Sequence, residues 1–183
     1  KLFPEFVETY LPNVLFEETD YLAYIAIYDD VYSNWKFTSE ILESLKSILE
    51  SSPHLYPAYM LYREISLELF HQTQDKSFLD KLIDVLNSAP IEYKDSKFYA
   101  FDLAVIAIKK GDKNKVATYI AQAEERGVAM EEIAVLKSDL HFSHGEYSLA
   151  IRELENALSS RKSFLILSRL ATLHTYAGQS DKA

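Results

Sequence analysis

The chain has 183 residues, of which 48% are hydrophobic and 13% are aromatic. This composition is typical of a globular protein and excludes an intrinsically disordered one. The formal net charge of -9 argues against binding to the phosphate backbone of nucleic acids and against docking on an anionic membrane surface, because both need a basic footprint. The same charge favours a basic peptide or a cationic ligand as the partner.

The sequence contains no cysteine, which excludes a disulfide framework, a thiolate zinc site and a cysteine nucleophile. With 4 glycines and 5 prolines it does not resemble a turn-rich β protein. No apolar run reaches the roughly 20 residues that span a bilayer, and no signal peptide is visible. The chain begins at Lys1 and stops inside a helical pattern, so we expect it to be a fragment of a longer protein.

Residues 1–20 are expected to form a lead-in to the helical part of the chain. Pro4 and Pro12 leave room for a turn or two of helix between them, because proline tends to end a helix before it. From Tyr21 onward, apolar residues recur at i, i+3 and i+4 spacing, which predicts amphipathic helices in succession. Turn signals divide these helices into pairs, and each pair forms one unit of a single predicted domain, residues 21–183.

The first predicted unit, residues 21–53, pairs a helix over 21–33 with a helix over 40–51. The second of these helices follows a hydroxyl side chain, Thr38 or Ser39, that can cap its first turn. The apolar positions of the first helix include Leu22, Ile25, Ala26 and Val31. Tyr21, Tyr24, Tyr28 and Tyr32 form a stripe on the same helix, which is either buried under the lead-in or a contact patch.

The second predicted unit, residues 56–90, has the same plan. Pro57 is well placed for the first turn of a helix, because its missing amide is not needed there. A polar loop separates this helix from its partner, which ends before Pro90. Pro90 therefore ends the second unit as Pro53 ends the first.

Three glycines mark the later units. Gly111, Gly145 and Gly178 lie 34 and 33 residues apart, and each separates an apolar stretch of helical spacing from the polar start of another. A repeat of this length predicts two short helices per unit, with each unit stacked on the next. The first of these units, residues 95–127, pairs a helix over 98–109 with a helix over 113–126. The next, residues 130–160, pairs a helix over 130–143 with a helix over 147–159. The last unit, residues 163–183, is expected to be truncated before its second helix.

The unit around Gly145 carries the most regular pattern of small, aromatic and large residues. The residues concerned are Ser138, Gly145, Tyr147, Ala150, Leu154, Ala157 and Leu158. This pattern resembles tetratricopeptide repeats, in which small residues let two helices approach closely and large ones fill the gaps between units. The resemblance implies an all-α fold, namely a right-handed superhelix of stacked antiparallel helix pairs with about four and a half repeats.

The order of the elements also resembles a narrower family. The Leu11-Pro12 ending of a short helix, the segments LKSILESSP and PAYMLYREI, and the HGEYSLAIRELENAL unit are similar to the helical sensor half of CadC/ToxR-type bacterial transcription regulators. The resemblance implies a module that senses a ligand or pH, with DNA contacted by a separate winged-helix part. It implies a periplasmic location, whereas a plain repeat protein fits the cytoplasm.

In a stack of this kind the first helices of the units line a concave groove. Six residues are expected there: Asp30, Met60, Glu64, Phe101, Asp139 and Phe142. They predict an acidic groove with an aromatic and methionine floor, suited to a basic or amphipathic peptide or to a small cationic effector. The alternative is that these carboxylates are ordinary solvated surface charges.

Other polar groups do not form a recognisable active site. His141 and His144 have the i, i+3 spacing of a metal pair, but packing is the stronger interpretation without a further ligand. Neighbouring carboxylates such as Asp29 and Asp30 point about 100° apart on a helix and do not share a site. The phosphate-binding, dinucleotide-binding, nucleophile-elbow and zinc-protease motifs are absent. We therefore expect no enzyme, no metal and no cofactor.

The leading hypothesis is a non-catalytic interaction or sensor module of a larger bacterial regulatory protein, without direct contact to nucleic acid or membrane. A second hypothesis is a plain scaffold that assembles a multiprotein complex and senses no ligand. An enzyme would depend on Asp139 or His141, but no motif supports one. A fourth hypothesis is a homo-oligomer, because Leu165, Leu170 and Leu173 have no following helix to cover them.

Overall fold

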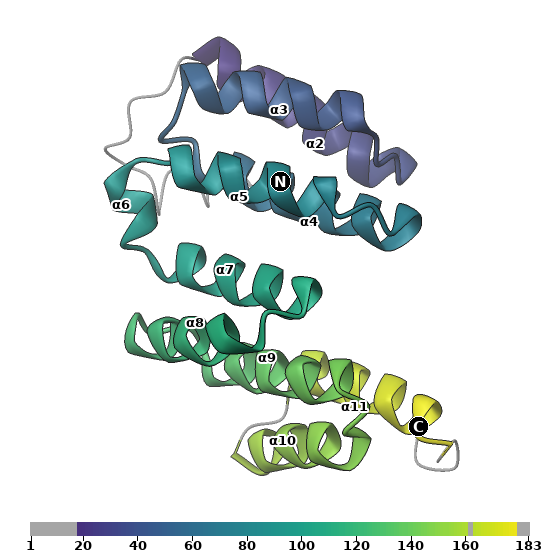
Figure 1. The fold of residues 1–183 in the computed structure, drawn as a ribbon. Coiled ribbons are helices and arrows are strands. Elements are labelled where there is room, and N and C mark those ends of the chain that lie inside the picture. Colours follow the sequence, from purple (N-terminus) through teal and green to yellow (C-terminus); the bar gives the residue numbers. More distant parts are fainter. Residues whose placement is uncertain (1–17, 161–162, 179–183) are drawn as a thin grey trace. The chain divides into compact units, whose positions relative to one another are not determined.

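The computed structural model describes residues 18–160 and 163–178 (Figure 1). Every regular element in these residues is an α-helix, which confirms the all-α class, and none is long and apolar enough to cross a membrane. The predicted helix between Pro4 and Pro12 and residues 179–183 of the last unit lie outside the described residues. The helices are α2 (Glu18–Asn34), α3 (Ser39–Ser51), α4 (Tyr56–Thr73), α5 (Ser77–Ser88), α6 (Ile91–Lys94), α7 (Lys97–Lys110), α8 (Lys113–Glu125), α9 (Met130–Ser143), α10 (Tyr147–Ser160) and α11 (Phe164–Tyr176).

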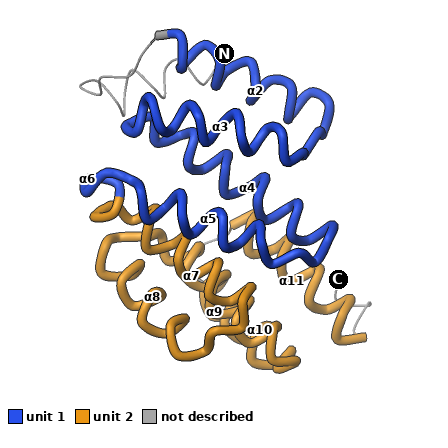
Figure 2. Tube along the Cα trace, turned by 45° about the horizontal axis from the view of Figure 1, so that its top comes forward, with its two compact units in different colours: residues 1–93 blue, residues 94–183 orange. Residues whose placement is uncertain are grey.

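These helices group into two compact units, residues 1–93 and 94–183 (Figure 2). Helices α2 to α5 belong to the first unit and α7 to α11 belong to the second, and the boundary falls inside the short helix α6. Within each unit, consecutive helices pack against one another, as α3 does with α4 and α9 does with α10. Each unit therefore has a core of its own.

In the first unit, α3 and α5 bury equivalent residues against α4. Each buried residue of α5 follows its counterpart in α3 by 37 positions. The pairs are Leu42 and Leu79, Leu45 and Leu82, Ile48 and Val85, and Leu49 and Leu86. Their spacing puts them on one stripe of each helix, and Leu61, Ile65 and Leu69 of α4 are buried with them. The two helices thus present the same face to the core.

The buried face of α2 contains only some of its apolar positions. Leu22 is 59% exposed, whereas Tyr24 and Val31 are buried. Tyrosines and aliphatic residues occur on several sides of α2 itself, so the spacing of its apolar residues does not identify one buried face. The tyrosine stripe is buried at Tyr24 and more open at Tyr32, where the ring of Tyr28 packs 4.5 Å away.

The second unit repeats its buried positions at a spacing of 34 residues. The pairs in its second helices, α8 and α10, are Val116 and Ala150, Ile120 and Leu154, and Ala123 and Ala157. The first helices, α7 and α9, bury Ala100 and Ala134, and Ala104 and Ser138, at the same spacing. Small residues at these positions let the helix backbones approach closely. The two hairpins of this unit are therefore built on one register.

A left-handed residue follows the first helix of each hairpin. These residues are Trp35, Gln74, Gly111, Gly145 and Gly178, with φ angles between 49° and 74°. In the second unit the turn is closed by the same hydrogen bond, in which the amide of Asp112 donates to the carbonyl of Ala107 at 2.9 Å and the amide of Glu146 donates to the carbonyl of His141 at 3.0 Å. This is the glycine-based helix ending that the sequence pattern predicts.

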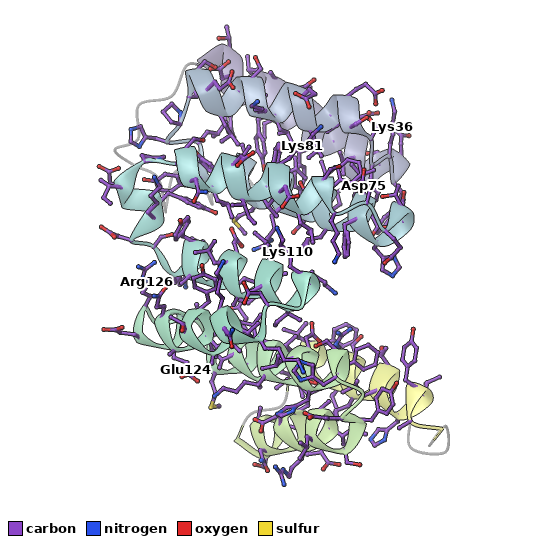
Figure 3. All side chains as sticks on the ribbon, in the orientation of Figure 1. Lys36, Asp75, Lys81, Lys110, Glu124 and Arg126 are labelled. Carbon is purple, nitrogen blue, oxygen red and sulfur yellow. The ribbon has the colours of Figure 1, made fainter. Side chains whose placement is uncertain are left out.

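Two contacts that the sequence does not predict complete the units. Tyr93 of α6 is buried in the first unit and stacks on Tyr59, with ring centroids 4.4 Å apart. In the second unit, Arg126, labelled in Figure 3, follows α8 and donates hydrogen bonds to the carbonyls of Lys94 at 2.6 Å and Ser96 at 3.4 Å. The guanidinium thereby holds the start of α7 close to the end of α8.

Candidate functional site

Asp30, the first predicted groove residue, lies near the end of α2 and is partly buried. Its carboxylate accepts a hydrogen bond from Nδ2 of Asn34 at 2.8 Å, and its other oxygen lies 3.9 Å from Nζ of Lys36. The side chains of both residues of the Lys36 pair are about half exposed. Such a pair is worth between about 0 and 1 kcal/mol, so an external cation can compete for this carboxylate.

Glu64, the second predicted carboxylate, is exposed on α4 and contacts α2. It accepts a hydrogen bond from the hydroxyl of Tyr32 and lies 3.9 Å from Nη2 of Arg63. Burial and the hydrogen bond to Glu64 both raise the pKa of Tyr32 above its ordinary value. Met60, one turn earlier on the same helix, is half-buried. The structure thus places Glu64 beside the tyrosine stripe of α2.

In the second unit, the structure brings Asp139 and Phe142 of α9 together with Arg169 of α11. Asp139 accepts hydrogen bonds from Nε of Arg169, at 2.9 Å, and from its Nη2. The guanidinium lies 5.9 Å from the centroid of the Phe142 ring, and that ring meets Tyr176 edge to face at 5.3 Å. The charge of Asp139 is therefore balanced within the chain. Phe101 packs against the core formed by α7, α8 and α9.

Of the predicted histidine pair, His141 is engaged with the turn between α9 and α10. Nδ1 of His141 lies 2.6 Å from Oε2 of Glu146. This hydrogen bond, aided by the charges of His144 and Lys113, holds the pKa of Glu146 below its ordinary value. Within residues 18–160 and 163–178, no group of three or more potential metal-ligating side chains converges.

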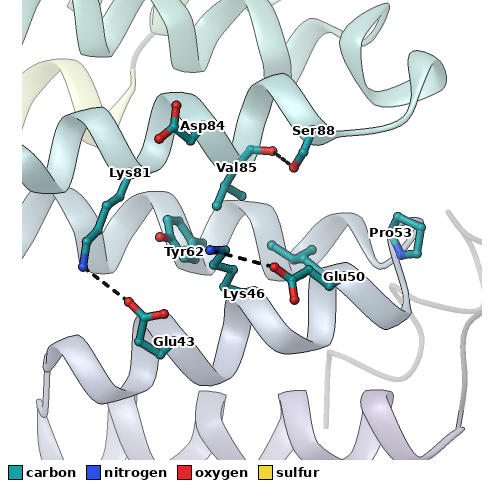
Figure 4. A pocket seen from close by; sticks show the side chains of 10 residues that line it. Glu43, Lys46, Glu50, Pro53, Tyr62, Lys81, Asp84, Val85 and Ser88 are labelled. Carbon is teal, nitrogen blue, oxygen red and sulfur yellow. Dashed lines mark hydrogen bonds and ion pairs between the residues drawn. The ribbon is translucent and has the colours of Figure 1, made fainter.

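A pocket of about 570 Å³ opens between α3 and α5 of the first unit (Figure 4). Tyr62 of α4 lies at its base, and Figure 4 shows this side chain between Glu43 of α3 and Asp84 of α5. The pocket is lined by Glu43, Lys46, Leu49, Glu50, Pro53, Tyr62, Lys81, Asp84, Val85 and Ser88. It lies on the face made by the second helices of the hairpins, which the predicted groove does not include.

The charged side chains around this pocket are unequally paired. Oε1 of Glu43 lies 3.3 Å from Nζ of Lys81, and Oε1 of Glu50 lies 3.9 Å from Nζ of Lys46. Asp84 makes neither an ion pair nor a hydrogen bond with another described residue. The rim therefore holds one carboxylate whose charge no neighbouring cation balances, in a pocket that also contains apolar side chains.

The hydroxyl of Tyr62 is the second polar group of the pocket that no described residue contacts by a hydrogen bond. The residue is 2% exposed, and among the described residues its hydroxyl has no hydrogen-bond partner. Burial, followed by the negative charges of Glu43 and Asp84, raises the pKa of Tyr62 to about 12. The hydroxyl is therefore protonated at neutral pH, and it can donate or accept a hydrogen bond.

A second pocket, of about 470 Å³, has the opposite charge and lies at the turns that follow α7 and α9. It is lined by Ile108, Lys109, Lys110, Gly111, Lys113, Ser143 and His144. Lysines in the last turn of a helix interact favourably with the helix dipole, which gives Lys109 and Lys110 a structural role without any ligand. The basic character of this pocket is explained by that role.

Comparison with protein families, curated proteins and solved structures found no match. The candidate sites are therefore judged on the chemistry of the residues themselves. The pocket between α3 and α5 is not predicted from the sequence, because the repeat pattern assigns binding to the first helix of each pair. The sequence contains one signal for this pocket. Tyr62 lies two positions before Glu64, and side chains two positions apart point to opposite sides of a helix, so α4 has a second polar face.

Proposed function

We propose that this chain is a non-catalytic interaction or sensor module of a larger bacterial regulatory protein, built from tetratricopeptide-like hairpins. In this proposal the hairpins stack as a right-handed superhelix, and the first helices present their polar residues to a basic protein segment. Stacked helical repeats suit this role because each repeat adds to a continuous surface without needing a catalytic centre.

The recurrence of buried positions carries the proposal. The buried residues of α5 follow those of α3 by 37 positions, those of α9 and α10 follow those of α7 and α8 by 34, and each hairpin turn has a left-handed residue. A chain of unrelated helices has no reason to keep such offsets over several residues per helix. The offset of 34 is the length of a tetratricopeptide repeat.

The chemistry of the proposed partner follows from the carboxylates of the first helices. Asp30, Glu64 and Asp139 each contact a side chain of the protein itself, and those contacts are partly exposed to solvent. The Asp30 and Glu64 carboxylates are about half exposed and their ion pairs are worth at most about 1 kcal/mol, so a basic segment can displace these pairs at small cost. Asp139 is held more tightly by Arg169. The net charge of -9 attracts such a segment over longer distances.

Calorimetry with a lysine-rich peptide tests this function, with an acidic peptide of equal length as the comparison. We expect the lysine-rich peptide to bind, and we expect the combined Glu64→Gln and Asp139→Asn variant to bind it less tightly. Glu155→Gln, an exposed change on α10, is the matched control. Equal binding of the acidic peptide, or undiminished binding by the combined variant, would contradict the proposal. A lysine-derived diamine separates a sensor from a scaffold, since only a sensor binds the small cation.

A further inference from the structure

The pocket between α3 and α5 brings a tyrosine hydroxyl and a carboxylate to one place. The side chain of Tyr62 is almost completely buried and its hydroxyl has no hydrogen-bond partner within the described residues, and the exposed Asp84 has no ion-pair partner there. One ligand in the pocket can form hydrogen bonds with both groups, because a phenol hydroxyl donates or accepts and a carboxylate accepts. Their position at one pocket points to a ligand that satisfies both (Figure 4).

The charge of the pocket selects a cation. Two of its three carboxylates, Glu43 and Glu50, are each balanced by a lysine of the pocket, and Asp84 is the one that remains. An anionic ligand would meet this net negative charge, whereas a cation would neutralise it. The apolar side chains of Leu49 and Val85 line the same pocket and can pack against an aliphatic stem.

We infer that this pocket is a second interaction site, which takes the guanidinium of an arginine side chain from a partner protein. The acceptors lie on different elements, with Asp84 on α5, Tyr62 on α4 and Glu43 on α3. A guanidinium carries five N–H donors in a rigid fork and can reach several acceptors at once. An ammonium group is more strongly hydrated and acts as a point charge, so lysine fits this arrangement less well.

The site is distinct from the proposed groove. Glu64 contacts Tyr32 of α2, whereas Tyr62 on the same helix lines a pocket between α3 and α5. A partner could therefore occupy one face of the first unit without touching the carboxylates of the other. The two surfaces can be tested separately, and failure at one leaves the other standing.

The test is a chemical-shift titration of the full chain with three short alanine peptides that carry one central arginine, lysine or citrulline. Citrulline has the shape of arginine without its charge. We expect the arginine peptide to shift amide signals of α3 and α5, and to bind about tenfold or more weakly to Asp84→Asn and to Tyr62→Phe, since each variant removes one hydrogen bond to a charged group. Asp29→Asn, an exposed carboxylate change on α2, should bind as the parent chain does.

Both variants nearly preserve the shape of the side chain, and the Tyr62 hydroxyl has no partner to lose, so we expect both to fold. Their amide spectra report this directly. Equal or tighter binding of the lysine or citrulline peptide, shifts confined to other helices, or unchanged affinity in both variants would overturn the inference. If the inference fails in this way, weaker binding of the lysine-rich peptide by the combined Glu64→Gln and Asp139→Asn variant would still support the proposed groove.

Discussion

Replacing Gly145 by alanine is expected to destabilise the second unit by about 1 kcal/mol through the backbone alone. Gly145 has a φ of 74°, and a Cβ built on it would meet no atom within 4 Å. Steric contact with neighbours therefore adds nothing to the cost. The left-handed conformation costs a residue with a Cβ roughly 1–2 kcal/mol, and alanine recovers about 0.4–1 kcal/mol because its unfolded chain has less entropy to lose.

Urea unfolding followed by far-ultraviolet circular dichroism measures this change, and a shift of about 2–4 °C in the melting temperature should accompany it. Gly111→Ala should cost the same, because this glycine has the same φ and the same open space. Gln74→Gly is the reciprocal change and should be neutral or stabilising, since Gln74 has a φ of 59°. An unchanged Gly145→Ala chain, or a loss above about 3 kcal/mol, would refute the reasoning.

Three further predictions concern single side chains. Arg169→Ala should lower stability by about 1–2 kcal/mol in urea, because it leaves the partly buried Asp139 carboxylate without its guanidinium. Stability should fall as pH rises from about 10 to about 12, by on the order of 3 kcal/mol from Tyr62, because the folded chain holds the Tyr62 proton more tightly than the unfolded chain. His141→Gln should raise the pKa of Glu146 towards its ordinary value, as carbon-detected titration can show.

Each of these has its own control. Arg152→Ala, an exposed change on α10, should leave stability within about 0.5 kcal/mol. Tyr62→Phe should reduce the alkaline loss by the share of Tyr62, while the loss from Tyr24, Tyr32 and Tyr59, whose pKa burial also raises, should remain. A loss of the same size in this variant would assign it to those tyrosines. For Glu146 the folded pKa is depressed, so its stabilising effect is present above the unfolded pKa and is lost as pH falls. An unchanged pKa of Glu146 in the His141→Gln variant would contradict the 2.6 Å contact between the two side chains.

Most helices could be predicted because several local signals agree. The pattern over residues 130–143 predicts a helix, and α9 spans Met130–Ser143. The predicted helix over 113–126 is α8, Lys113–Glu125, which Asp112 caps by accepting a hydrogen bond from the amide of Lys115. Caps, glycine turns and the apolar period are all properties of neighbouring residues, so the sequence contains them.

The exceptions depend on contacts between distant residues. Helix α6 has four residues, which is too short to show a helical period, and Tyr93 is buried because Tyr59 of α4 stacks on it. Leu22 belongs to a helix with tyrosines on several sides, so the buried face is decided by what packs against α2. Neither outcome follows from local pattern, because tertiary contacts override it.

The candidate sites divide in the same way. Asp139 and Phe142 are three positions apart, so any helix over these residues places them close together. This spacing does not reveal that Arg169 of α11 satisfies Asp139, which depends on how two helices pack. The pocket at Tyr62 needs residues from three helices, α3, α4 and α5, and no single stretch of sequence contains that set.

The equivalence of the hairpins is tested most directly by an experimental structure of the chain. We expect α3 to superpose on α5 with a 37-residue offset, and α7 and α8 on α9 and α10 with a 34-residue offset, with the buried pairs coinciding. Hairpins that fail to superpose at these offsets, or a closed bundle in which equivalent residues face different directions, would contradict the repeat and the interaction surfaces inferred from it.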